Sequence, residues 1–373
     1  MIYEISDVLR IAKRHKNNKR SYLLVNPLQS KHIPVSPTIA LDMMKTLGDK
    51  VASKYPDAKL VVGFAETATA IGAMVAASLA EDCIYIHTTR ENFDDKYNFI
   101  EFLEEHSHAP EQKLYCDKFN DWLKNTSTIV FVDDELSTGK TLRNIISQLK
   151  SEYPVLNDKK IVAASIINRL SSENEDLLKS DGIDCEYLIK LPKFDFDVSN
   201  VITHAPKILN PSIESSEKIL FYRKISLSNP RLSVPIYNYI KEINIIGNEI
   251  LDLADGYNSI LVLGTEECML PAIIIGKILE TQGYSVFSHS TTRSPIGISC
   301  QNSYPITEGY QLSSFYDINR TTYIYNLRYY DLIFVISDVE NWKLESLRSL
   351  LAALKVHGYD KIIFIGGSDV QHL

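Results

Sequence analysis

Two adjacent carboxylates, Asp133 and Asp134, come directly after the apolar run 129–132. A short run of β-branched and aromatic residues is typical of a buried strand, which would carry the two acids to the edge of a sheet. There they can accept hydrogen bonds from neighbouring hydroxyl groups of a sugar. We therefore expect Asp133 and Asp134 to hold a diol.

The turn that follows these acids consists of small, hydroxylated and glycine residues and opens a helical pattern over 142–149. A helix start presents backbone N–H groups and the positive end of the helix dipole, which together bind a phosphate. The residues expected to form this cradle are Ser137, Thr138, Gly139, Lys140 and Thr141. The acidic pair and the cradle together predict a site for ribose with its 5′-phosphate.

This stretch has three alternative interpretations: a P-loop, the acidic strand end of an ATPase and a helix-capping turn. Residues 139–141 imitate the end of a P-loop, but that pattern needs glycine where Asp134 stands, and a carboxylate there would repel a polyphosphate. The acidic strand end of an ATPase would need a glycine-rich lysine loop upstream, and the sequence has none. An acidic turn that only caps a helix is the structural alternative.

The elements around this stretch alternate between strand and helix patterns. Apolar runs predict strands, and apolar residues at helical spacing predict helices. Strands are expected over 59–63, 83–87, 128–133 and 160–167, and helices over 36–51, 71–79 and 142–149. This alternation predicts a mostly parallel sheet with flanking helices, whose ligands bind beyond the carboxyl ends of the strands.

The chain of 373 residues is long enough for two cores. Several prolines and a serine-rich stretch interrupt the rhythm between 191 and 230, and a strand-to-glycine pattern returns at 260–264. We therefore expect a first domain over 1–205, a linker over 206–230 and a second, smaller α/β domain over 231–373.

The two halves share short patterns in the same order. Residues 61–66 can be laid against 262–267, Thr88-Thr-Arg90 against Thr291-Thr-Arg293, and 129–134 against 333–338. This order indicates that the second domain is a degenerate duplicate of the first. The alternative is the strand, turn and helix order that any two doubly wound domains share.

Composition excludes several classes of function. The chain has 39 basic and 47 acidic residues, so its net charge of −8 disfavours nucleic acid and anionic membranes as partners. No apolar run approaches the ~20 residues of a membrane span, and no export signal is visible, which together predict a cytoplasmic protein. The five cysteines lie far apart without a CxxC pair, so neither a disulfide framework nor a metal site is expected.

The stretch 129–141 resembles the motif of the type I phosphoribosyltransferases, which has apolar residues, two acids and Thr-Gly before a helix. Residues 63–72 (GFAETATAIG), 105–109 (EHSHA) and 291–295 (TTRSP) are more narrowly similar to a phosphoribosyltransferase fused to a TRSP domain, found with tellurium-resistance gene clusters. The resemblance covers nearly the whole chain. It implies the type I phosphoribosyltransferase fold, followed by the companion domain.

The resemblance also implies roles for individual residues. Asp133 and Asp134 would be the catalytic pair that holds the ribose of phosphoribosyl diphosphate (PRPP), and residues 137–141 would bind its 5′-phosphate. The implied diphosphate-binding residues are Ala65, Glu66, Thr67 and Arg90. Residues 91–113 would form a flap that excludes water from the reacting sugar.

Further roles follow for residues near these motifs. His106 and His108 lie in the flap, where a substrate contact, a proton donor, a metal site and a solvated loop are the alternatives. Lys31-His32 stand where related transferases build a hood over the acceptor, and Asn168-Arg169 end a strand at the same edge.

The second half lacks the phosphate cradle, because residues 339–343 replace the Ser/Thr-Gly turn after Asp338. It should not bind PRPP in the same way. A polar cluster at its strand ends is nevertheless a candidate site for an anion or an acceptor, with a plain structural turn as the alternative. This cluster comprises Glu267, Thr291, Thr292, Arg293 and Ser294.

The resemblance therefore implies an enzyme that moves ribose 5-phosphate from PRPP to a base-like acceptor and releases diphosphate. Mg²⁺ would be carried by the diphosphate, and no metal site belonging to the protein is expected. The expected partners are PRPP and a small-molecule acceptor, and such transferases commonly form homodimers. The alternative function is a PRPP or nucleotide sensor without turnover.

Overall fold

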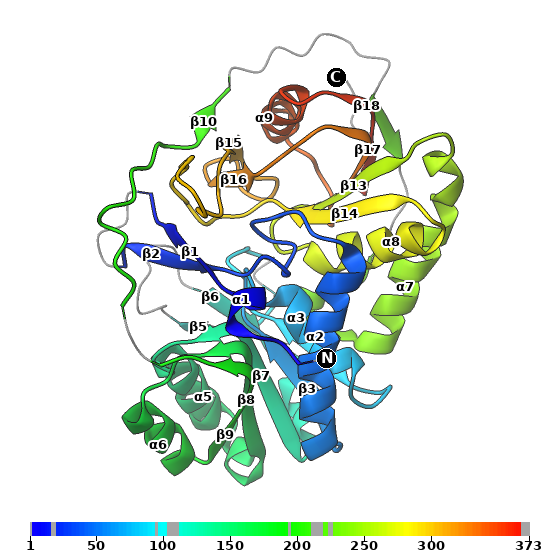
Figure 1. Cartoon of the computed structure of the whole chain (residues 1–373). Coiled ribbons are helices and arrows are strands. Elements are labelled where there is room, and N and C mark those ends of the chain that lie inside the picture. Colours follow the sequence, from blue (N-terminus) through cyan, green and yellow to red (C-terminus); the bar gives the residue numbers. More distant parts are fainter. Residues whose placement is uncertain are drawn as a thin grey trace. The chain divides into compact units, whose positions relative to one another are not determined.

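The computed structural model describes residues 2–15, 20–93, 96–102, 112–192, 195–209, 219–222 and 227–366. The chain divides into two compact units (Figure 1). Unit 1 comprises Met1–Glu4, Asp42–Asp195 and Ser228–Lys241, and unit 2 comprises Ile5–Leu41, Phe196–Leu227 and Glu242–Leu373. The units differ from the predicted division because the segment Ile5–Leu41 clusters with unit 2 and Ser228–Lys241 with unit 1.

Unit 1 is built on a six-stranded sheet in the order β12-β4-β3-β7-β8-β9. All neighbouring strands are parallel except β12, which pairs antiparallel with β4. The strands are β3 (Ala58–Gly63), β4 (Ile84–His87), β7 (Thr128–Leu136), β8 (Lys160–Asn168), β9 (Ile183–Lys190) and β12 (Val234–Pro235). The four strands expected from the sequence are therefore confirmed, and they form one mostly parallel sheet.

The strand order changes direction at β3. The chain passes from β3 to β4 on one side of it, and later returns to β7 on the other side. A doubly wound sheet opens a crevice at such a point, beyond the carboxyl ends of the two strands. The loops after β3 and β7 are therefore the place where unit 1 is best able to hold a ligand.

Helices cover both faces of this sheet (Figure 1). They are α2 (Pro37–Lys54), α3 (Thr69–Ala77), α4 (Phe119–Lys124), α5 (Lys140–Glu152) and α6 (Ser172–Ser180). One side of α5 buries Leu142, Ile145 and Leu149 in a core with Leu60 and Phe131 of the sheet. Since β3 to β4 and β7 to β8 run in opposite directions, right-handed crossovers place α3 and α5 on opposite faces.

An antiparallel hairpin of β5 (Phe99–Phe102) and β6 (Gln112–Tyr115) occupies the region expected to be a flap. The hairpin joins the main body through an antiparallel bridge between Thr89 and Lys113, with backbone bonds of 2.9 and 2.7 Å. Tyr115 packs its ring against Phe93 and Phe99. In the described part of the segment expected to be a flap, two antiparallel strands are thus joined by aromatic packing.

Unit 2 contains a five-stranded parallel sheet in the order β11-β18-β17-β13-β14. Its strands are β11 (Ile219–Tyr222), β13 (Ser259–Gly264), β14 (Ser285–Ser290), β17 (Tyr330–Ile336) and β18 (Tyr359–Ile365). The order β14-β13-β17-β18 matches β4-β3-β7-β8 of unit 1 in sequence order and in direction. The internal likeness seen in the sequence therefore extends to the topology.

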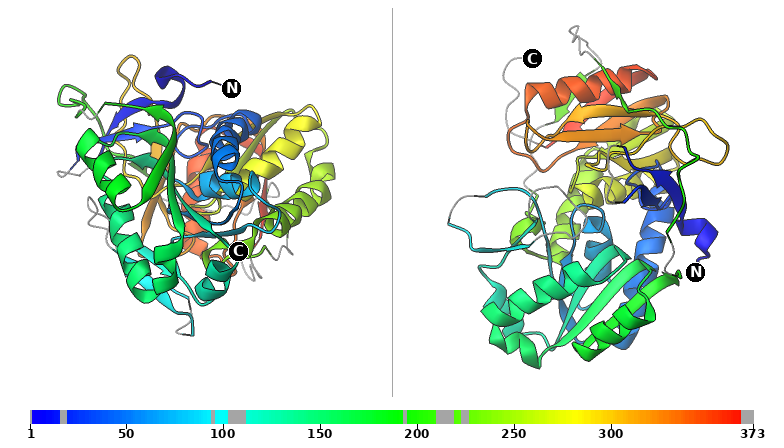
Figure 2. Two further views of the ribbon diagram at one scale, coloured as in Figure 1. Left: turned by 90° about the horizontal axis from the view of Figure 1, so that it is seen from below. Right: turned by 90° about the vertical axis from the view of Figure 1, so that its left-hand side faces the viewer.

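The remaining elements of unit 2 pack around this sheet. A second sheet combines β10 (Lys207–Ile208), β15 (Gly309–Ser313) and β16 (Thr321–Tyr325), and β1 (Arg10–Lys13) pairs with β2 (Tyr22–Val25). The helices are α1 (Ile5–Val8), α7 (Ile236–Glu249), which runs from unit 1 into unit 2, α8 (Met269–Thr281) and α9 (Leu344–Lys355). In Figure 2 α9 lies beside β15. No helix in the described part of the chain has the length and apolar character needed to cross a membrane.

Gly264 ends β13, and we expect its replacement by alanine to destabilise the protein by about 2 kcal/mol through overpacking. A Cβ atom there would lie 2.3 Å from the carbonyl oxygen of Cys268, which is backbone and has little room to move. Urea denaturation of Gly264→Ala measures the loss. The control is Gly182→Asn. The φ of Gly182 is +76°, and a Cβ atom there would have no neighbour within 4 Å, so this substitution changes a glycine without overpacking. Equal stability of Gly264→Ala and the unmodified chain would contradict the prediction.

Candidate functional site at the ends of β3 and β7

The acidic pair lies inside β7, which continues to Leu136. Adjacent residues of a strand point to opposite faces, so the strand alone does not bring the two carboxylates together. The backbone N–H of Asp134 donates to Oδ1 of Asp133 at 2.9 Å, which directs the Asp133 carboxylate toward the next peptide group of the chain. Both side chains are half-buried.

Asp134 connects β7 to the loop after β3. The hydroxyl of Thr67 donates to Oδ1 of Asp134 at 2.9 Å. Burial raises the pKa of Asp134 above its ordinary value, and the neighbouring Glu135 carboxylate raises it further, whereas hydrogen bonds to the carboxylate act in the opposite direction. The structure thus brings together two residues that were predicted for different parts of one ligand.

The loop after β3 is held by backbone bonds to both neighbouring strands. Phe64 N–H donates to the carbonyl of Val132 at 2.9 Å, and Thr88 N–H donates to the carbonyl of Gly63 at 2.9 Å. Ala65 N–H donates to the hydroxyl of Thr88 at 2.8 Å, and the Ala65–Glu66 peptide bond is cis. The Ala65 amide therefore donates within the protein, and the expected role of Ala65 as a diphosphate ligand stays a prediction.

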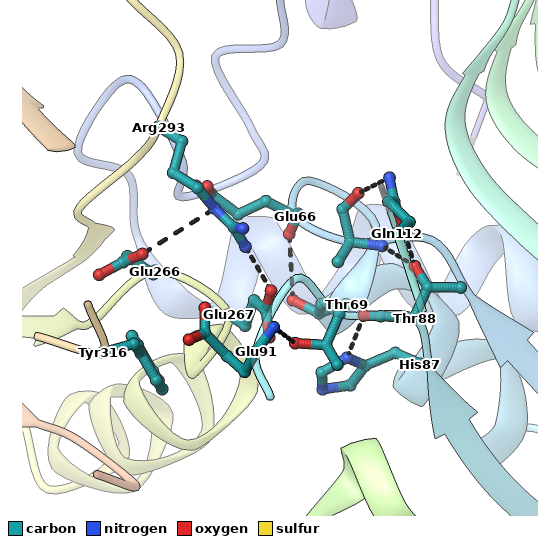
Figure 3. Close-up of polar contacts among 12 residues, drawn as sticks. Glu66, Thr69, His87, Thr88, Glu91, Gln112, Glu266, Glu267, Arg293 and Tyr316 are labelled. Carbon is teal, nitrogen blue, oxygen red and sulfur yellow. Dashed lines mark hydrogen bonds and ion pairs between the residues drawn. The ribbon is translucent and has the colours of Figure 1, made fainter. Parts of the chain in front are cut away.

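Two side chains that the sequence analysis did not identify complete this arrangement. Gln112 Nε2 donates to the carbonyl of Ala65 at 2.9 Å, and Gln112 Oε1 accepts a hydrogen bond from the hydroxyl of Thr88 (Figure 3). Thr69 adds a bond from its hydroxyl to the carbonyl of Glu66 at 3.3 Å. No local pattern marks Gln112, because its partners lie far away in the sequence.

Arg90 is half-buried and directly follows the bridged residue Thr89 at the end of β4. Because β4 is parallel to β3, Arg90 and the loop after β3 belong to the same edge of the sheet. His106 and His108, the other flap residues of interest, lie outside the described residues.

The expected phosphate cradle lies at the start of α5. Gly139 has φ of +74° and precedes Lys140, the first residue of the helix. A Cβ atom at Gly139 would lie 3.2 Å from Leu178 and 3.3 Å from Leu170, so both the backbone conformation and the packing favour glycine. The hydroxyl of Thr138 accepts a bond from Lys140 N–H at 3.3 Å. The cradle residues Ser137, Thr138 and Thr141 are half-buried, and Lys140 is exposed.

Glu135 and Arg169 form an ion pair of 2.9 Å beside the acidic pair, and their side chains are 12% and 5% exposed. Asn168 is also held within the fold, because its Oδ1 accepts from Leu170 N–H at 2.8 Å and its Nδ2 donates to Glu175 at 3.1 Å. These contacts hold Asn168 and Arg169 within the fold, and the acceptor contacts expected for them stay predictions.

Unit 2 repeats the backbone bonds of unit 1 at its own strand ends. Thr265 N–H donates to Ile336 at 3.1 Å, and Thr291 N–H donates to Gly264 at 3.0 Å. Glu266 N–H donates to the hydroxyl of Thr291 at 2.9 Å, as Ala65 N–H does to Thr88. A glutamate therefore stands in unit 2 where unit 1 has a small residue.

Glu266 is fully buried and anchors a charged network (Figure 3). Its Oε1 accepts from the hydroxyl of Ser314 at 2.6 Å and from Phe315 N–H at 3.1 Å. Its Oε2 lies 3.9 Å from Arg293 Nε and 3.6 Å from Arg320 Nη1. Arg293 also pairs with Glu267. A loop filled by its own carboxylates is poorly suited to a diphosphate.

Lys31 is fully buried in unit 2. Its ammonium donates to the carbonyls of Glu266 at 2.7 Å and Thr291 at 3.0 Å. This contact replaces the acceptor contact expected for Lys31, and it is the unit 2 counterpart of the bond from Gln112 to Ala65. Thr292 forms an antiparallel bridge with Tyr323, which is equivalent to the bridge between Thr89 and Lys113 in unit 1. Ser294 N–H donates to the hydroxyl of Thr292 at 3.2 Å.

Trp342 lies in the segment that replaces the phosphate cradle. Its ring packs against Phe221, Phe315 and Phe364, with ring centroids 5.3 to 6.5 Å apart. The turn before α9 is therefore fixed by aromatic packing, and the loss of the phosphate cradle from the second half stays a prediction.

Comparisons with known proteins fit this arrangement. Residues 8–190 match the model of a family described as phosphoribosyl transferase, and residues 238–354 match the TRSP domain that follows this transferase. Residues 8–190 thus belong to the phosphoribosyltransferase family, and a TRSP domain follows this transferase region. A search of the curated proteins gives no significant match.

Solved structures of phosphoribosyltransferases are similar at low identity. The adenine enzyme from Trypanosoma brucei is 16% identical over 41% of this chain and 65% of its own, with a TM-score of 0.31. The adenine enzyme from Thermoanaerobacter pseudethanolicus is 16% identical over 50% and 98%, with a TM-score of 0.33. The orotate enzyme from Aeropyrum pernix is 16% identical over 50% and 89%, with a TM-score of 0.26.

We expect Asp134→Asn to gain stability over the unmodified chain as pH rises from about 4 towards neutrality. A raised pKa means that the folded state holds the proton more tightly, so the unmodified chain loses stability as pH rises through that pKa. Asparagine removes this loss and can still accept from Thr67. Urea denaturation at pH 4.5 and 7.5 measures the difference, with the exposed Asp121→Asn as control. If the free energy of unfolding had the same pH dependence in Asp134→Asn and in the unmodified chain, burial would not raise the pKa of Asp134.

Glu266→Gln should destabilise the protein by about 3 kcal/mol, because it removes the buried carboxylate that Arg293 and Arg320 share and leaves their charges only partly compensated. The control is Asp317→Asn, since Asp317 is 46% exposed and lies 3.9 Å from Arg320, so that its loss should cost under about 1 kcal/mol. Thermal unfolding of the two variants separates the cases. Similar melting temperatures would show that the network contributes little.

Proposed function

We propose that unit 1 transfers ribose 5-phosphate from PRPP to a base-like acceptor and releases diphosphate. The observation that supports this most is the contact between the two predicted binding segments at the point where the strand order reverses. Thr67, from the loop assigned to diphosphate, bonds to Asp134, from the pair assigned to ribose. A substrate with both groups on one sugar would need these segments side by side.

The acidic pair would orient the sugar and stabilise positive charge. The transition state of such a transfer resembles a ribosyl cation, and carboxylates fixed in a partly dehydrated site lower the energy of that charge. Asp134 is suited to this role because burial and Glu135 already disfavour its negative charge, so a nearby positive charge would relieve the cost.

The other segments would hold the two phosphate ends. The amides at the start of α5 would bind the 5′-phosphate. The loop after β3, together with Arg90, would stabilise the charge that develops on the departing diphosphate. The hairpin β5–β6 would keep water away from the reacting sugar, which would otherwise be hydrolysed.

Mg²⁺ fits these residues as a metal that arrives with the substrate. The described residues contain no group of three or more metal-binding side chains, whereas Mg²⁺ is commonly held by phosphate oxygens, water and one or two carboxylates. The carboxylates of Asp133 and Asp134 have the donor chemistry for such a contact. When bound, Mg²⁺ would neutralise charge on the diphosphate.

We expect the double variant Asp133→Asn, Asp134→Asn to lower diphosphate release from PRPP and Mg²⁺ at least ~100-fold in the presence of an acceptor base, because it removes charge at constant volume. Coupled detection of diphosphate with a panel of bases measures the effect, and calorimetry with PRPP measures binding.

The matched control is Asp338→Asn, since Asp338 occupies in unit 2 the sequence position equivalent to Asp134, in the unit without a phosphate cradle. Its turnover should equal that of the unmodified chain. Unchanged turnover in the double variant would refute the role of the acidic pair. Binding of PRPP without diphosphate release for any base would favour the sensor.

A further inference from the structure

We infer that Gln112 and Thr88 are positioning residues that fix the loop after β3 for the diphosphate. This inference rests on the proposed function and names residues that neither the sequence motif nor the comparisons assign. The two side chains, which lie side by side in Figure 3, come from the base of the β5–β6 hairpin and from the end of β4. Both bond to a single residue of the loop, Ala65.

The contacts form a closed ring of hydrogen bonds. Ala65 N–H donates to the Thr88 hydroxyl at 2.8 Å, and that hydroxyl donates to Gln112 Oε1. Gln112 Nε2 then donates to the Ala65 carbonyl at 2.9 Å. Both backbone polar groups of Ala65 are thereby fixed, so the peptide planes on either side of it have one orientation.

Burial makes this ring costly to break. Thr88 is 0% and Gln112 is 2% exposed, so a polar group left without its partner there would lack water as a substitute. The ring also connects to rigid elements, because Thr88 N–H bonds to Gly63 and Thr89 forms the bridge to Lys113 beside Gln112. The loop after β3, the end of β4 and the base of the β5–β6 hairpin are therefore joined by one set of hydrogen bonds.

Unit 2 fixes the equivalent loop residue, Glu266, through a different set of side chains. There the Thr291 hydroxyl accepts from Glu266 N–H at 2.9 Å, and the Glu266 carbonyl accepts from Lys31 at 2.7 Å. The residue of β16 that corresponds to Gln112 by the bridge register is Thr322, which is too short to take the same role. In both units the second loop residue after the strand, Ala65 or Glu266, thus has its N–H and its carbonyl held by side chains from elsewhere in the unit.

The inference predicts a selective loss of affinity. A loosened loop would weaken ligands that carry diphosphate, whereas ribose 5-phosphate, which lacks it, would bind as before. We expect Gln112→Leu and Thr88→Val to raise the Kd of PRPP and of inorganic diphosphate about 10-fold, with the Kd of ribose 5-phosphate within about 2-fold of the unmodified chain.

The experiment is calorimetric titration of the full chain, in the presence of Mg²⁺, with PRPP, diphosphate and ribose 5-phosphate. Thr88→Ser keeps the hydroxyl and should restore the affinity lost in Thr88→Val. The matched control is Thr128→Val, which removes a buried threonine hydroxyl at the other end of β7, where it donates to Asp57 at 3.2 Å. It should bind all three ligands as the unmodified chain does.

The outcomes separate this inference from the proposed function. Each Kd comes from folded molecules of one sample, so partial unfolding changes the stoichiometry and not the ratio between ligands. If Gln112→Leu does not fold, the Thr88 pair carries the test. Equal losses for all three ligands, or no loss, overturn the inference alone. Failure of the unmodified chain to bind PRPP overturns the proposed function and the inference with it.

Discussion

The candidate site depends on the backbone bond from Phe64 N–H to the carbonyl of Val132, which continues the pairing of β3 and β7 past the end of β3. Because this pairing extends to the last residue of β3, the loop that follows starts beside Asp133 and Asp134. The Thr67 hydroxyl can then reach Asp134, and the crevice of the doubly wound sheet acquires polar groups from both sides. A parallel sheet without this reversal of strand order would separate the two loops by a further strand.

The two units carry different side chains at equivalent strand ends of one scaffold. The strand order and the bonds after β13 repeat those of unit 1, down to the threonine that accepts from the loop amide. This repetition of side-chain detail favours duplication over a chance likeness of doubly wound domains. The chemistry differs because Glu266 brings a buried carboxylate into the loop and Trp342 fixes the turn before α9. On the proposed function, unit 2 would keep the fold and lack the means of binding phosphate.

Local patterns predicted the strands and helices that build the sheet of unit 1, because burial on both faces and helical periodicity leave a direct mark on the sequence. The acidic pair and the glycine turn were visible for the same reason, since charge and backbone demands fall within a few residues. Gln112 and Lys31 were not predicted in their observed roles. Each acts on a carbonyl far along the chain, Ala65 and Glu266 respectively, and only the tertiary fold brings these partners together. Arg169 shows the related difficulty that a position at a strand end does not reveal whether a side chain faces a ligand or a buried acid such as Glu135.

The acidic residues at the end of β7 differ in the partners of their carboxylates. Residues 133–135 are three consecutive acids, and Glu135 pairs with the buried Arg169. Asp134 is bonded to a neutral hydroxyl instead, and burial together with the charge of Glu135 raises its pKa. Keeping Asp134 ionised therefore costs folding free energy, which a well-packed fold would avoid unless another group compensates. On the proposed function, the cationic sugar supplies that compensation only while the glycosidic bond is breaking, so the same cost that weakens the fold favours the transition state over the ground state.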